Sequence, residues 1–301
     1  MLKYTGSPVR EQSVPRLAEL SLGSFASPPA SVSPVRWRQD GLFPADFQTV
    51  SRLRKPDTGV AGTNPLVAKL GHFAELDRAD IAAIEALSAC SKPYRAGHIL
   101  AHENTPSDHV FLIMRGMACR HKLLRGGQRQ ILGFLIPGDL CDLNFISHNS
   151  TDHNVSLLSG SDLVKIPRRL LIDLFARHPR IVRALSLAAL LDVAILREWL
   201  LSVGQRSAVE RLSHFFCEMK VRLESIGQLG NDGFIELPIN QSTLADATGL
   251  TTVHVNRTLQ RLRSDGLIRF GQKRLAILDF DRLAALAGFD ANYLHLRRYP
   301  R

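Results

Sequence analysis

The chain has 301 residues, which is enough length for two domains. Its formal net charge of +10 favours a polyanionic partner. No C-x-x-C pair occurs among its four scattered cysteines, so we expect no disulfide framework and a reducing cytoplasm as the location; they are Cys90, Cys119, Cys141 and Cys217. The most apolar run, Leu185 to Leu196, is interrupted by Asp192, which argues against a membrane span of ~20 nearly uncharged residues.

The N-terminal part, residues 1–64, is rich in Pro, Ser and Arg and shows no sustained hydrophobic periodicity. It contains no long apolar segment of the kind that a secretory signal needs. We expect a disordered extension here, or a start site set too far upstream.

Residues 65–178 have a regular pattern. Apolar positions between Leu70 and Leu87 predict short helices. From Lys92 to Pro167, short apolar runs alternate with polar turns and with glycines at Gly97, Gly116, Gly126, Gly127, Gly138 and Gly160. Many short strands at close spacing predict a small antiparallel barrel or roll.

A long helix is predicted from Pro179 to about Leu201, in a segment assigned to residues 179–204. It is apolar on nearly every side, so one face can cover the roll while the other needs a second cover. A twin helix from a second copy of the chain is the economical choice, and replacing Leu185 and Ile195 with Glu is expected to give monomers. The alternative is a helix buried wholly inside one chain.

The stretch LADATGLTTVHVNRTLQRLRSDGLI, Leu244 to Ile268, predicts two short helices joined by a turn at Gly249. In the second helix an apolar stripe recurs at three- and four-residue spacing, and the opposite face carries Thr252, His254, Asn256, Arg257, Gln260 and Arg261. This is the helix-turn-helix pattern, whose second helix fits a DNA major groove. An ordinary helical hairpin with a solvated face is the alternative.

The flanks of this motif favour a winged unit over residues 205–285, followed by a C-terminal tail, 286–301. Phe234 to Asn240 is interpreted as a strand that ends at a helix cap, and Leu267 to Leu278 as a β-hairpin around Gly271 and Gln272. Between Leu237 and Leu275 there are six basic and two acidic residues, so the net charge is 6 − 2 = +4, which suits a phosphate-facing surface.

Roll, long helix and winged helix in this order resemble the Crp/Fnr family of bacterial transcription regulators, from Pro65 to the C-terminus. The most specific segments are AGHILAHENTPSDHVFLIMRG, GGQRQILGFLIPGDLCDL and the helix-turn-helix. The resemblance implies an α+β fold: an antiparallel β-roll of the double-stranded β-helix or jelly-roll kind that acts as a cyclic-nucleotide-binding-like sensor, a dimerisation helix and a winged helix-turn-helix.

The resemblance also implies roles for residues of the winged unit. Arg257 falls on the recognition arginine that reads a guanine, and Asn240 and Gln241 fall where the family contacts phosphate. The family's recognition glutamate is missing, because Val253 stands there and cannot accept a hydrogen bond from cytosine. The full set of candidate DNA-binding residues is Asn240, Gln241, Thr252, His254, Asn256, Arg257, Lys273 and Arg274.

The sensor departs from the cyclic-AMP members of the family. Its turn reads GDLCDLNF, so Asp142 is the only stand-in for their ribose-binding glutamate, and the candidate ligand contacts are Gly138, Asp139 and Asp142. No Lys or Arg lies between Asp142 and Leu163 to neutralise a phosphate, although Arg120 could reach in from a distance.

The sequence also gives little support for an iron–sulfur cluster, a metal or haem. No cysteine precedes Cys90, which disfavours an iron–sulfur cluster near the N-terminus. Seven histidines between residues 65 and 167 suggest a metal or haem, but polar surface is the preferred interpretation; they are His72, His98, His102, His109, His121, His148 and His153. Cys141 is either a redox thiol or an inert buried cysteine.

These patterns predict a homodimeric regulator without catalytic activity that binds an inverted repeat of double-stranded DNA. RNA polymerase is an expected partner, the effector is unknown, and no cofactor, metal or membrane is expected. The alternatives are a cyclic-nucleotide-responsive regulator with a non-standard phosphate pocket, an enzyme regulated by the roll, and an interaction module that does not bind DNA.

Overall fold

A computed structural model describes residues 64–141 and 150–296, all within the compact unit Gly59–Arg301. Two short helices come first, α1 (Pro65–Leu70) and α2 (Arg78–Ser88), and both begin at side-chain caps. Asn64 accepts hydrogen bonds from the first turn of α1, and Asp77 forms a capping box with Asp80 at the start of α2.

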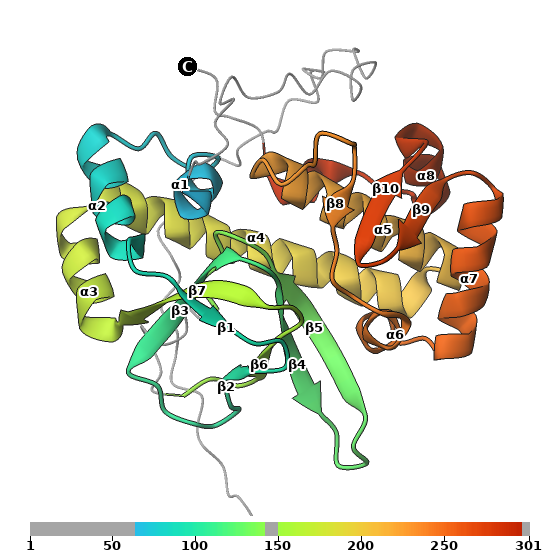
Figure 1. The fold of residues 1–301 in the computed structure, drawn as a ribbon, viewed down its shortest axis with the longest axis horizontal. Coiled ribbons are helices and arrows are strands. Elements are labelled where there is room, and N and C mark those ends of the chain that lie inside the picture. Colours follow the sequence, from blue (N-terminus) through green and yellow to red (C-terminus); the bar gives the residue numbers. More distant parts are fainter. Residues whose placement is uncertain (1–63, 142–149, 297–301) are drawn as a thin grey trace, which may run out of the picture. The chain divides into compact units, whose positions relative to one another are not determined.

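Seven short strands then form the predicted roll (Figure 1). One sheet has the order β1-β7-β3 and the other β2-β6-β4-β5, and all the strand pairs are antiparallel. The strands are β1 (Lys92–Tyr94), β2 (Ile99–Ala101), β3 (His109–Arg115), β4 (Ala118–Leu123), β5 (Arg129–Leu135), β6 (Asn154–Leu157) and β7 (Ser161–Pro167). Buried side chains of β3, β4, β6 and β7 form the interior between the sheets.

Helix α3 (Arg168–Arg177) follows β7 in a segment where the sequence analysis assigns no element. Its buried residues, Leu171 and Leu174, join the core that α1, α2 and the long helix share. Helix α3 follows directly on β7 and ends just before Pro179, so no loop in the sequence marks it as a separate element.

The long helix α4 extends from Pro179 to Gln205, a little beyond the predicted end (Figure 1). Its buried side is made of Ile181, Ala184, Leu185, Ala188, Leu191, Ala194 and Ile195. Leu185 and Ile195 are only 7% and 5% exposed, because they pack inside their own chain. The expectation that these two positions mark the partner-facing side is therefore wrong.

The C-terminal half contains α5 (Ala208–Ser225), β8 (Ile235–Glu236), α6 (Gln241–Thr248), α7 (Thr252–Ser264), β9 (Ile268–Gly271), β10 (Arg274–Ile277) and α8 (Phe280–Ala287). The three strands form a sheet of order β8-β10-β9. The segment predicted as a tail contains the end of α8 and the 3-10 helix η3 (Ala291–Leu294), whose Leu294 is fully buried.

The roll and the C-terminal half share one hydrophobic core. Ile131, Phe134 and Ile136 of the β5 region belong to the same buried cluster as Phe215, Phe216 and Met219 of α5. The α+β fold of roll, long helix and winged helix-turn-helix is as the sequence predicts. Within the described residues, no helix is both long and apolar enough to cross a membrane.

Candidate DNA-binding surface and sensor interior

The helix-turn-helix is held by caps at both of its helices. The Asn240 side chain accepts a 2.8 Å hydrogen bond from the Thr243 amide, and the Thr251 hydroxyl accepts one of 3.2 Å from His254. Between the helices Gly249 has a φ of +65°, a left-handed conformation that a side chain would strain. These local features fix the angle at which α7 leaves the turn.

Helix α7 separates into a buried and an exposed face, as predicted. Val255, Thr258, Leu259 and Leu262 are buried. The exposed residues of its first two turns are Thr252, Val253, His254, Asn256 and Arg257. An exposed polar face on a helix that is anchored by its apolar side is what a major-groove reader requires.

The remaining candidate residues lie at the two ends of this surface. Asn240 and Gln241 start α6, and the Gln241 amide donates to Asn256 Oδ1 at 3.5 Å, which joins the first helix to the recognition face. Lys273 is exposed in the β9–β10 turn with a φ of 62°. Arg274 forms an ion pair with Asp232, and its guanidinium lies 4.6 Å from the centre of the Phe234 ring.

In the roll, Gly138 and Asp139 hold the fold together. A side chain at Gly138, whose φ is +88°, would collide with the Pro65 carbonyl. Asp139 is buried, accepts a 2.9 Å hydrogen bond from the Ile136 amide and forms an ion pair with Lys69. Both residues therefore tie the turn after β5 to α1. Asp142 lies outside the described residues, as does His148.

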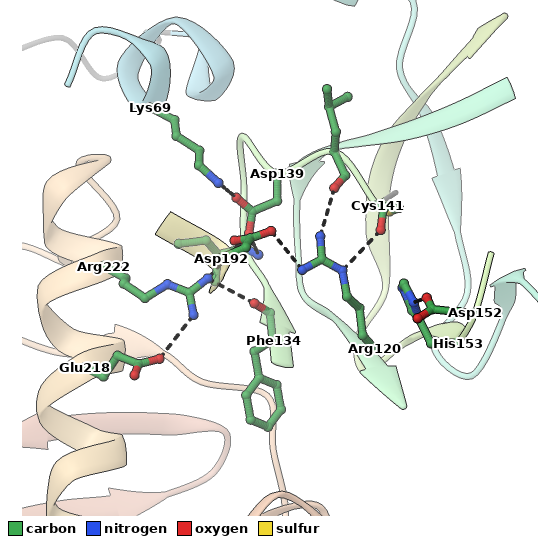
Figure 2. Close-up of polar contacts among 12 residues, drawn as sticks. Lys69, Arg120, Phe134, Asp139, Cys141, Asp152, His153, Asp192, Glu218 and Arg222 are labelled. Carbon is green, nitrogen blue, oxygen red and sulfur yellow. Dashed lines mark hydrogen bonds and ion pairs between the residues drawn. The ribbon is translucent and has the colours of Figure 1, made fainter. Parts of the chain in front are cut away.

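Arg120 of β4 reaches α4 instead of an open cavity (Figure 2). Its guanidinium donates to Asp192 at 2.9 Å and to the carbonyls of Cys141 and Leu140 at 3.3 and 3.5 Å. Burial opposes the charge on Arg120, but the carboxylates of Asp192 and Asp139 together outweigh it and raise the pKa of Arg120. At Asp192 burial acts in the opposite sense, but the surrounding cations, with Arg120 the foremost, together outweigh it and lower the pKa of that carboxyl.

A second buried charge pair links α5 to the roll. Arg222 donates to the Phe134 carbonyl at 3.0 Å, contacts Glu218 at 3.3 Å and lies 3.5 Å from Asp139 (Figure 2). Glu218 is fully buried, and burial raises its pKa although Arg222 acts in the opposite direction. Sequence reasoning missed the role of Arg222, because its partners Phe134 and Asp139 lie more than 80 residues away in the chain.

Two further groups complete the Glu218 site. The Tyr293 hydroxyl donates to Glu218 at 2.9 Å, and the indole of Trp199 on α4 donates at 3.2 Å. A separate ion pair, between Arg129 of β5 and Asp246 of α6, is 2.7 Å long and connects the roll directly to the helix-turn-helix. The sequence signal for the Glu218 site is a charged or aromatic residue in an otherwise apolar helix stripe, as at Glu218 and Trp199.

The histidines of the roll are dispersed. His121 is buried, 3.5 Å from the Ser156 hydroxyl and 4.0 Å from the Cys119 thiol, and burial lowers its pKa. In the part of the chain that the structure describes, no three His, Cys, Asp or Glu side chains come together as a metal-ligand group. Cys119 and Cys141 are both buried.

Comparison with known proteins agrees with this arrangement. Residues 91–178 match the cyclic nucleotide-binding domain, and residues 210–286 match the Crp-like helix-turn-helix domain. The nitrogen fixation regulation protein FixK of Bradyrhizobium diazoefficiens is 27% identical over 195 residues, 64% of this chain and 80% of that protein. The transcriptional activatory protein AadR of Rhodopseudomonas palustris is 28% identical over 225 residues, 75% of this chain and 92% of that protein.

Among solved structures, FixK2 from Bradyrhizobium japonicum has a TM-score of 0.59 at 26% identity, and the match covers 65% of this chain and 96% of FixK2. Both domain matches fall on the segments that form the roll and the winged helix, in the same order. The chain therefore belongs to the Crp/Fnr family of DNA-binding transcription regulators.

Proposed function

We propose that the chain acts as a homodimer on an inverted-repeat DNA site, with α4 as the dimer interface and α7 as the base-reading helix. A stripe on α4 that is apolar except for Ser186 and is exposed or half-exposed along its length carries this proposal. Its members recur with alternating four- and three-residue spacing, and none is buried; they are Val182, Ser186, Ala189, Val193, Leu196, Leu200 and Val203.

This spacing is the heptad pattern by which two helices pack side by side. Leu200 is 76% exposed and Leu190, beside the stripe, is 63% exposed. Large side chains this exposed on a helix whose other face is already buried indicate a partner surface. A second copy of the chain carries the same stripe and can pack against it. The two-fold symmetry of such a dimer requires a DNA site that is an inverted repeat.

The exposed face of α7 supports the DNA-reading role. Arg257 stands one turn after Val253, and its guanidinium can bond O6 and N7 of one guanine. Thr252, His254 and Asn256 accompany it on the same exposed face. Asn240, Gln241 and Lys273 lie at the margins, where phosphate contacts position a recognition helix without reading sequence.

Arg274 is expected to contribute less than Lys273, because Asp232 already neutralises part of its charge. We therefore expect each wing to make one main phosphate contact, through Lys273. This refines the sequence-based expectation that both residues bind DNA.

The test compares Arg257→Ala with Lys273→Ala on a selected site and on the same site with its guanine replaced, at several salt concentrations. Arg257→Ala is expected to remove ~1–3 kcal/mol of discrimination at that base pair. Lys273→Ala is expected to weaken both sites alike and to reduce the salt slope by about one for each half-site, or about two for the dimer. Equal losses on the two sites for Arg257→Ala would make it a phosphate anchor and refute its reading role.

The sensor is proposed to work without cyclic AMP at the family's standard position. Arg120 was the cation that could reach a phosphate there, and its guanidinium is already committed to Asp192 and two carbonyls. A phosphate would have to displace this pair, which is held in a mostly buried position. We also propose that the protein works in the cytoplasm with RNA polymerase and has no catalytic role, as its relatives are transcription regulators.

A further inference from the structure

Val253 is an apolar side chain on a surface that otherwise presents hydrogen-bonding groups. It is 64% exposed, the most exposed large apolar residue of the described segment 207–296, where Leu229 and Leu278 are the others. It stands in the first turn of α7 between the exposed residues Thr252 and His254. Single exposed apolar residues are common on protein surfaces, but this one lies on the recognition helix.

The position places Val253 on the groove-facing row of the recognition helix. Arg257 follows four residues later, so the two side chains project from the same face, ~6 Å apart along the helix axis. Base steps are ~3.4 Å apart along one strand, so this separation corresponds to about two base pairs. The N-terminal end of a recognition helix is also the part that approaches the base edges, where a short side chain can reach them.

Valine can neither donate nor accept a hydrogen bond, so it cannot read the polar pattern of any base. The major groove offers one apolar feature to such a side chain, the 5-methyl group of thymine. We propose that Val253 packs on a thymine 5-methyl group within about two base pairs of the guanine contacted by Arg257, and thereby sets the base preference there. The inference rests on the proposed function of α7 and names the chemical group that it recognises.

The experiment begins by selecting the half-site from random duplexes with the full-length protein. Each thymine near the guanine is then replaced by deoxyuracil, which removes only the methyl group. At one position the wild type should lose about fourfold in affinity per half-site and about fifteenfold when both half-sites are substituted, as expected for one buried methyl each. Replacing cytosine by 5-methylcytosine at that position should raise affinity by a similar factor.

Val253→Ala should bind the thymine and deoxyuracil sites within twofold of each other, because its shorter side chain leaves most of the 5-methyl group uncovered. Leu278→Ala removes an exposed apolar side chain outside α7 and should keep the wild-type thymine preference. Binding of both variants to non-specific duplex at low salt shows that the winged unit is folded.

The proposal is overturned if the wild type binds thymine and deoxyuracil sites equally at every position of the half-site, or if no thymine lies within three base pairs of the guanine. In either case Arg257→Ala can still abolish guanine discrimination, and the proposed function then stands. If the selection enriches no motif at all, the proposed function fails and this inference fails with it.

Discussion

The buried pair of Glu218 and Arg222 predicts an unequal response to substitution. Replacing Arg222 with Met keeps most of the side-chain volume but leaves the fully buried Glu218 without a cation. Breaking a buried pair from one side costs about 3–5 kcal/mol, and we expect a loss of that size in the free energy of unfolding.

Glu218→Gln should cost much less, about 1 kcal/mol, because it removes a charge and leaves only modest hydrogen-bond changes behind. Arg222 then retains Asp139 and the Phe134 carbonyl as partners. The double variant should therefore be more stable than Arg222→Met alone. Lys220→Met on the same helix breaks the partly exposed pair with Glu224 and should cost at most about 0.5 kcal/mol.

The pH dependence has a definite sign. Burial raises the pKa of Glu218 in the folded chain, so the folded state holds this proton more tightly than the unfolded state does. The associated stability is present below the ordinary glutamate pKa of about 4.3 and is lost as the pH rises through the folded value. Removal of Arg222 raises that value further, so Arg222→Met should be less damaging at pH 5 than at pH 8.

Urea unfolding followed by tryptophan fluorescence, at pH 5 and pH 8, measures these differences. The reasoning is refuted if Arg222→Met loses no more stability than Lys220→Met, or if the single losses of Arg222→Met and Glu218→Gln simply add in the double variant. If Arg222→Met lowers the free energy of unfolding equally at pH 5 and pH 8, the loss does not come from an unpaired Glu218 carboxylate.

Three further outcomes are expected. Leu200→Glu should make the protein monomeric at micromolar concentration by light scattering, while Leu170→Glu, an exposed position on α3, should leave the dimer intact; a monomeric wild type would refute the interface. Arg129→Glu should lower the thermal midpoint by a few degrees, about 1 kcal/mol, and adding Asp246→Arg should restore it unless the ion pair contributes nothing. Cyclic AMP should leave DNA affinity unchanged, since Arg120 is occupied, and saturable heat in a calorimetric titration would contradict this.

The fold could be predicted where local chemistry determines structure. Gly249, Thr251 and the apolar stripe of α7 specify the helix-turn-helix from adjacent residues, and its helices begin where the sequence places them. Turn glycines and short apolar runs similarly predicted the roll. Helix α3 and η3 were missed, because α3 has no side-chain cap at its start and η3, which begins at the Asp290 cap, has only four residues.

Contacts between distant segments could not be predicted in this way. Nothing local indicates that Arg222 meets Phe134, 88 residues away, or that Arg129 meets Asp246, 117 residues away. The same limit explains the error at Leu185 and Ile195. An apolar helix pattern shows that two faces need cover, but it does not show which face packs inside the chain.

These long-range contacts place α4 between the roll and the winged unit as a shared support. Arg120 of the roll binds Asp192 on α4, and seven residues later Trp199 donates from the same helix to Glu218 of α5. Seven residues make about two helical turns, so both contacts lie on one side of α4. A shift or rotation of α4 would strain the two contacts together. The heptad stripe lies on the adjacent face of α4, since Leu196 follows Asp192 by four residues. If α4 forms the proposed dimer interface, a change in dimer packing would therefore act on the helix that holds both the roll and the winged unit.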